Sequence, residues 1–103
     1  MLVALNKISK EYNLSLEYLM QKSKAYGITK KDNKGRLSID DKYLKLLTMY
    51  YSIAYLRDFL IYWIEYNFTD TELRIELYKQ LIRMNYDEVI RFIISKNLMW
   101  NLK

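Results

Sequence analysis

The chain contains no proline and only two glycines among its 103 residues, so very little in the sequence interrupts a helix. These are the two residues that cost most inside a helix, and their scarcity favours long uninterrupted helices. Just over half of the residues, 51%, are apolar, which argues against disorder. We therefore expect a mainly α-helical protein that forms one compact unit. A chain this short buries a limited core, which favours self-association.

The excess positive charge lies entirely in the first half of the chain. Residues 1–46 hold ten Lys and Arg against five Asp and Glu, whereas residues 47–103 hold seven of each. The second half instead contains twelve of the sixteen aromatic residues. A cationic segment suits a polyanion, and an aromatic segment suits a protein surface. The predicted division is therefore a cationic module over residues 1–45, with two short helices and a hairpin, and a helical dimerisation or partner-binding part over residues 46–103.

Two short helices are predicted near the N-terminus, over residues 2–12 and 16–26. Asn13 tolerates a left-handed backbone, Ser15 is a good N-cap, and Gly27 is placed to end the second helix. Helical spacing assigns an inward face to each helix. The residues expected to face inward are Leu5, Ile8, Tyr12, Leu16, Leu19, Met20 and Ser23.

The helical pattern does not continue through residues 28–39. Residues 28–31 and 36–39 are predicted to pair as short strands around a turn at residues 32–35, because Asn and Gly are typical of such turns. An irregular polar loop is the alternative. Asp40 or Ser38 would then cap a third helix.

That third helix is predicted to run over residues 41–67, a length of about 40 Å. From Leu46 to Ile64 it is apolar on nearly every face, which is typical of a helix buried on all sides or in a membrane. Arg57 and Asp58 lie in the middle of this segment, where charges are costly in lipid. Burial by neighbouring helices and by a second copy of the chain is therefore the preferred interpretation, and no membrane association is expected.

Two shorter helices are predicted to follow. Residues 69–72 match a capping box with Thr69 as N-cap, which predicts a helix from there to about residue 84. Residues 85–88 match a second capping box, which predicts a helix to about residue 96. The apolar residues 98–100 are not expected to form a free end. The predicted inward-facing residues of the two helices are Leu73, Leu77, Leu81, Val89, Phe92 and Ile93.

The run from Ile8 to Leu19 resembles the helix-turn-helix motif of DNA-binding proteins. The family pattern has an apolar residue and then a small one, a turn residue four positions later, an apolar residue, a Ser or Thr cap, and an apolar residue four positions after the cap. The matching residues here are Ile8, Ser9, Asn13, Leu14, Ser15 and Leu19. Ser9 replaces the usual Ala and Asn13 the usual Gly, and both replacements are sterically tolerable. The alternative is a plain helical corner without a DNA-binding role.

Residues 27–43 resemble the wing of small excisionase-like winged-helix regulators, which extends the resemblance over about residues 5–45. The same residues also resemble the N-terminal module of bacterial translation initiation factor 2. The first resemblance implies binding of duplex DNA, with the second helix as recognition helix and the hairpin as wing. The second implies that this topology also serves contacts with RNA or protein.

Six cations cluster between residues 22 and 36, with Asp32 as the only acid among them. Flexible cations suit phosphate contacts, Gln21 suits adenine, and Tyr18 suits apolar or backbone contact. Glu17 repels phosphate unless its carboxylate meets a cytosine amino group. The candidate nucleic-acid-binding residues are Tyr18, Gln21, Lys22, Lys24, Lys30, Lys31, Lys34 and Arg36. A solvated charged face is the alternative.

The aromatic residues of the predicted long helix suit a core or an interface. Base stacking on single strands would need interleaved cations, and Arg57 is the only cation nearby. Tyr and Trp suit interfaces because the ring is buried while the polar atom finds a partner. The candidate interface residues of a homodimer are Tyr51, Tyr55, Phe59, Tyr62 and Trp63.

Nothing in the sequence favours catalysis. The chain has no His and no Cys, which removes the commonest general base, thiolate chemistry and disulfides. The acidic pairs at residues 40–41, 70–72 and 87–88 lie at predicted helix starts, where capping explains them. We therefore expect no catalytic residue, no metal and no cofactor.

The sequence thus predicts a small DNA-binding protein, a transcriptional or mobile-element regulator that acts as a homodimer. No secretory signal is visible, which predicts a cytoplasmic protein. The alternative is a non-enzymatic helical adaptor, accessory subunit or inhibitor that docks on a larger protein.

Overall fold

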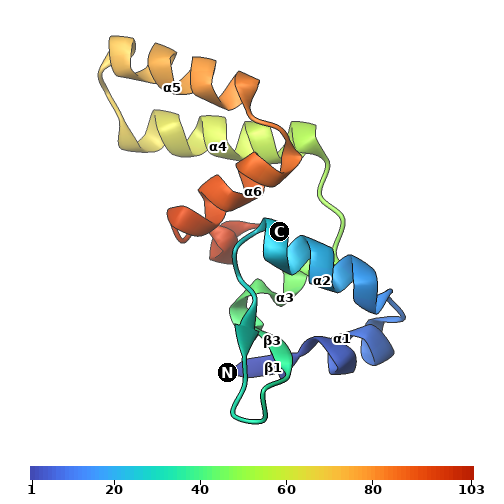
Figure 1. Ribbon diagram of the computed structural model, residues 1–103. Coiled ribbons are helices and arrows are strands. Elements are labelled where there is room, and N and C mark those ends of the chain that lie inside the picture. The colour runs from blue at the N-terminus through green and yellow to red at the C-terminus, as the bar shows by residue number, and fades with distance from the viewer. The chain divides into compact units, whose positions relative to one another are not determined.

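The computed structural model describes residues 1–103 as two compact units, Met1–Tyr50 and Tyr51–Lys103. The fold is mainly helical with one small sheet, as predicted (Figure 1). The first unit contains β1 (Leu2–Ala4), α1 (Leu5–Tyr12), α2 (Leu16–Ala25), β2 (Lys30–Lys31), β3 (Leu37–Asp40), the 3₁₀ helix η1 (Asp41–Tyr43) and α3 (Leu44–Thr48). The second contains α4 (Ile53–Asn67), α5 (Thr71–Arg83), α6 (Tyr86–Ser95) and the 3₁₀ helix η2 (Met99–Asn101). The units divide after residue 50, five residues beyond the predicted division after residue 45.

The sheet of the first unit is antiparallel, with strand order β1-β3-β2. The predicted hairpin is confirmed, since β2 pairs with β3 across a turn that contains Gly35 at a φ of 76°. The predicted start of the first helix at Leu2 is wrong. Residues 2–4 form a strand against residues 38–40, and the helix begins at Leu5. Leu and Val suit a strand, and pairing with a distant strand overrides the local helical pattern.

The connection between α1 and α2 follows the predicted turn chemistry. Asn13 adopts the left-handed conformation with φ 53° and ψ 46°. The Ser15 side chain accepts a hydrogen bond from the Tyr18 backbone N–H and caps α2, and Gly27 follows α2 at a φ of 69°. The Ser9 hydroxyl donates to the Leu14 carbonyl at 2.6 Å, so the small residue of α1 also holds the turn.

Replacement of Asn13 tests this turn. Asn13→Val should lower the free energy of unfolding by about 1–2 kcal/mol, because a β-branched residue is poorly tolerated at positive φ, and Asn13→Gly should be nearly neutral. The measurement is a denaturant melt of each variant. Asn6→Val is the matched control, since Asn6 is exposed in the first turn of α1 without a positive φ, and Val and Asn have similar helix propensities. If Val is accepted at residue 13 as readily as Gly, the turn assignment is wrong.

The core of the first unit forms where α1, α2, β3 and α3 meet. Leu5, Ile8, Leu19, Ile39 and Leu47 are buried there, together with the predicted inward residue Ser23. The predictions for Tyr12, Leu16 and Met20 are wrong, because all three side chains are exposed. Tyr12 and Leu16 flank the turn at helix ends that remain accessible, and Met20 lies about 100° around α2 from Leu19.

The long helix predicted over residues 41–67 is wrong, because the chain leaves helical geometry between α3 and α4. Asp40 caps η1, as one of the two predicted caps, and α3 ends at Thr48. Met49 has an extended backbone, and the Ser52 side chain accepts from the Tyr55 backbone N–H to cap α4. The interruption needs neither Gly nor Pro, because a serine cap and the burial of Tyr51 against Tyr55 stabilise it.

In the second unit, α4 buries one stripe rather than its whole circumference. Leu56, Leu60 and Ile64 lie at four-residue spacing and are buried, together with Val89, Ile90 and Ile93 of α6 and Leu81 of α5. Leu98 and Met99 are also buried, as the apolar tail predicted, whereas Trp100 is exposed. Leu73 is exposed, so that prediction is wrong. Leu77 and Phe92 are half-buried and line a small cavity of this unit, and Ile90 is also buried in the stripe of α6.

The helix caps of this unit correct one prediction and confirm another. Asp70, not Thr69, caps α5, because its carboxylate accepts from the backbone N–H groups of Glu72 and Leu73. A charged cap at a helix N-terminus also interacts favourably with the helix dipole, which favours Asp over the neighbouring Thr. The capping box at residues 85–88 is confirmed, with Asn85 and Glu88 each bonding the other's backbone.

Two arginines link α4 and α5, which run antiparallel (Figure 1). Arg57 of α4 donates to the carbonyl of Met84 at 3.0 Å, just beyond the end of α5. Arg74 of α5 donates to the carbonyl of Glu65 at 2.7 Å and to that of Phe68, near the end of α4. Each cation therefore satisfies carbonyls that have no partner within their own helix and interacts favourably with the negative end of the dipole. This arrangement explains why Arg57 occupies the middle of an apolar helix.

The longest helix of the structure, α4, has 15 residues. None of the helices is both long and apolar enough to cross a membrane.

Candidate nucleic-acid interface

The outer face of α2, opposite the buried Leu19, carries Glu17, Gln21 and Lys24. All three side chains are exposed, and their spacing of four and three residues places them in a row along the helix. The Ser15 cap and the left-handed Asn13 set where α2 begins, and burial of Leu19 and Ser23 sets its rotation. Local turn chemistry and two core contacts therefore determine which residues this face presents.

Tyr18 and Lys22 lie on a different flank of α2. Lys22 is about 160° around the helix from Lys24, since each residue advances by about 100°. Its ammonium lies 5.8 Å from the centre of the Tyr26 ring, and the side chain is half-buried. The structure thus separates the predicted residues of α2 into Gln21 with Lys24 and Tyr18 with Lys22.

The hairpin carries three exposed cations, Lys30, Lys31 and Lys34. Arg36 is also exposed, but its Nε donates to the Asp32 carboxylate at 2.8 Å. Asp32 further accepts from the backbone N–H groups of Lys34 and Arg36, and the Arg36 N–H is the main reason that the pKa of Asp32 is lowered. Asp32 is therefore a structural residue of the turn, and Arg36 is partly neutralised.

A hollow of about 450 Å³ lies between α2 and the hairpin, and we name it the basic hollow. Sequence reasoning missed its apolar and hydroxyl members, because their alignment depends on how the sheet packs beside α2. Its lining residues are Met20, Gln21, Lys24, Thr29 and Leu37. The Thr29 hydroxyl donates to Ser23 Oγ at 2.9 Å and so ties the hairpin strand to α2.

The register of the sheet places the hairpin cations relative to this hollow. Lys31 is directly opposite Leu37, whereas Lys30 is opposite Ser38. Directly opposite residues point to the same face of a sheet, so Lys31 lies on the face that lines the basic hollow and Lys30 on the other. Lys24 thus lines the basic hollow, and Lys31 shares a sheet face with its lining residue Leu37. No family model, curated protein or solved structure matched this chain in our comparisons.

The second unit carries an aromatic surface around a hollow of about 520 Å³, which we name the aromatic hollow. Its lining residues are Phe59, Tyr62, Trp63, Glu65, Tyr66, Asn67 and Asn101. Tyr62 and Tyr66 are 75% and 90% exposed, so their rings stand in solvent. Tyr66 was not among the predicted interface residues, although its four-residue spacing from Tyr62 places both on one helix face.

The predicted interface residues do not all reach this surface. Tyr51 is only 4% exposed and stacks on Tyr55 with ring centres 5.8 Å apart, and burial is the main reason that the pKa of its hydroxyl is raised. Trp63 makes edge-to-face contacts with Phe68 and Phe92, at 5.6 and 5.7 Å between ring centres. These rings contribute to the packing of the second unit itself, and Tyr62 is the most exposed of the predicted set.

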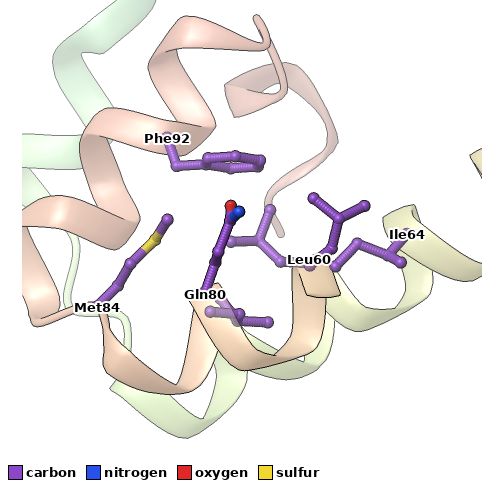
Figure 2. Close-up of a pocket in the computed structure, with 7 residues that line it drawn as sticks. Leu60, Ile64, Gln80, Met84 and Phe92 are labelled. Carbon is purple, nitrogen blue, oxygen red and sulfur yellow. The ribbon is translucent and has the colours of Figure 1, made fainter. Parts of the chain in front are cut away.

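A small cavity of about 10 Å³ lies within the second unit (Figure 2). Leu60, Ile64, Met84 and Phe92 are among its lining residues, and Figure 2 shows the Gln80 side chain extending toward the Phe92 ring. This volume is close to that of a single water molecule. The cavity is therefore a packing defect of the core rather than a ligand site.

Proposed function

We propose that the first unit binds duplex DNA through α2 and the β2–β3 hairpin. The observation that carries the proposal is the basic hollow, which Gln21 and Lys24 of α2 line together with Leu37, the residue directly opposite Lys31 in the hairpin. An α-helix fits the major groove of B-DNA, and the outer face of α2 supplies both a base-reading amide and a cation. One sugar–phosphate strand would follow the basic hollow, with sugars against Met20 and Leu37 and phosphates near Lys24 and Lys31.

The charge distribution supports this orientation. Residues 1–46 have a net charge of +5, and residues 47–103 have a net charge of zero. A polyanion is therefore attracted to the first unit, and the second unit is electrostatically free for protein contacts. We further propose that two copies pair through the aromatic hollow, and that the dimer acts as a transcriptional or mobile-element regulator. Pairing would join two weak modules on one duplex and raise the affinity without any new contact.

A salt series tests the proposal. Fluorescence anisotropy with a labelled duplex should show the logarithm of the association constant falling linearly with the logarithm of the salt concentration. Each phosphate contact contributes a slope of about −0.9 in duplex DNA. An unlabelled single strand of the same sequence is the control competitor and should compete less well. A protein that binds neither the duplex nor a heparin column at low salt is not a nucleic-acid-binding protein.

A second candidate function is supported by the aromatic hollow. Exposed Tyr and half-buried Trp are typical of protein interfaces, and the second unit has no net charge to repel a partner. In that case the chain is an adaptor, accessory subunit or inhibitor that docks on a larger protein, and its cations only solubilise it. Absence of duplex binding in the salt series would favour this function.

A further inference from the structure

From the outer face of α2, we infer that Glu17 and Gln21 are the base-reading residues of the duplex complex, and that they select a C·G pair and a nearby A·T pair. The inference rests on the proposed function of the first unit. Both residues are exposed and about one helical turn apart, on the outer face of α2 that also carries Lys24. Neither side chain forms a hydrogen bond or an ion pair within the chain, so both are available to a ligand.

Glu17 is informative because a carboxylate opposes the binding of any polyanion. On a face that only contacts phosphates, this side chain would weaken the affinity for duplex DNA of every sequence. In the major groove, a carboxylate is matched by the N4 amino group of cytosine, which donates a hydrogen bond. Glu17 therefore tolerates the cytosine amino group and penalises a base that places an acceptor at that point, such as O4 of thymine or O6 of guanine. Such a residue lowers non-specific affinity and raises specificity at the same time.

Gln21 completes the pair of reading residues. Its amide both donates and accepts, which matches the N7 acceptor and the N6 donor of adenine. Four residues along a helix correspond to a rise of about 6 Å. Base pairs are stacked about 3.4 Å apart, so Glu17 and Gln21 reach pairs one or two steps apart. The preferred site therefore contains a cytosine and an adenine within two steps of one another.

The test is selection from a randomised duplex library, followed by binding measurements on the selected duplex. The wild-type protein should enrich duplexes with C and A at this spacing. Exchange of the C·G pair for T·A should weaken the wild type by about tenfold. Glu17→Gln should bind unrelated duplexes more tightly and lose this discrimination. Gln21→Ala should lose discrimination at the A·T pair and keep it at the C·G pair.

Glu11→Gln is the matched control, because it makes the same change of charge at an exposed residue of α1 that is paired with Lys7 at 3.9 Å. This variant should leave both preferences unchanged. If duplexes bind but Glu17→Gln discriminates as the wild type does, the inference is overturned and the proposed function stands. If Glu11→Gln has the same effect as Glu17→Gln, net charge rather than base reading is responsible, and the inference is again overturned. Absence of duplex binding at any salt concentration overturns both.

Discussion

Replacement of Lys30, Lys31 and Lys34 together by Ala is expected to weaken binding to duplexes of every sequence. The slope of log affinity against log salt should flatten by up to about three units, because each lost phosphate contact removes about 0.9. The hairpin itself should persist, since its turn depends on Asp32 and Gly35 and the three lysine side chains are exposed. Anisotropy measurements at several salt concentrations check this result, and circular dichroism checks the fold.

Single variants and a matched triple variant make this prediction specific. Lys31→Ala should have a larger effect than Lys30→Ala, because only Lys31 is on the sheet face of the basic hollow. Replacement of Lys79, Arg83 and Lys103 removes the same charge from exposed positions of the second unit. An equal loss of affinity in both triple variants would mean that net charge, not the hairpin, controls binding. An unchanged slope in the hairpin variant would remove these residues from the contact surface.

Trp63→Ala is expected to destabilise the second unit by about 2–4 kcal/mol, because truncation removes contacts with two other rings and leaves a cavity. Those rings belong to Phe68, just after α4, and to Phe92 of α6. Most of the loss should already be present at the lowest protein concentration, since the two ring contacts lie within one chain. Urea melts followed by circular dichroism at two protein concentrations, about a hundredfold apart, provide the measurement.

Tyr66→Ala is the control for the contribution of aromatic residues to pairing. The Tyr66 side chain is 90% exposed, so its loss should leave the stability of the single chain nearly unchanged. If two copies pair through the aromatic hollow, this variant should dissociate at higher concentration than the wild type in sedimentation equilibrium. The opposite pattern, with Trp63→Ala harmful only where the wild type is dimeric, would place Trp63 in the interface. A wild type that stays monomeric at about a hundred micromolar would overturn the homodimer proposal.

Local chemistry made several elements predictable from the sequence. Ser15, Asn85 and Asp40 cap the helices that follow them, and Asn13 and Gly27 adopt the left-handed backbone expected of them. The hairpin followed from an Asn and a Gly between two β-prone runs. Each of these features depends on a few neighbouring residues and on hydrogen bonds between them. A single sequence therefore contains enough information to place them.

The two errors in element boundaries have one physical origin, which is competition between local preference and distant contacts. Residues 2–4 form a strand because β3, more than thirty residues away, offers hydrogen-bonding partners. The long apolar run divides because burial of Tyr51 and the Ser52 cap together outweigh continuation of the helix. Both outcomes depend on groups that the local pattern does not contain.

For the candidate site, the residue types and the clustering of the cations in the first half can be read directly from the amino-acid sequence. Which of them share one surface depends on tertiary packing. The rotation of α2 directs Gln21 and Lys24 to the basic hollow and Lys22 toward Tyr26. The sheet register places Lys31 and Lys30 on opposite faces of the sheet, and the turn brings Arg36 into an ion pair with Asp32. Helix rotation and strand register are set by which apolar side chains fill the core, so the direction of each surface residue follows from packing rather than from its own identity.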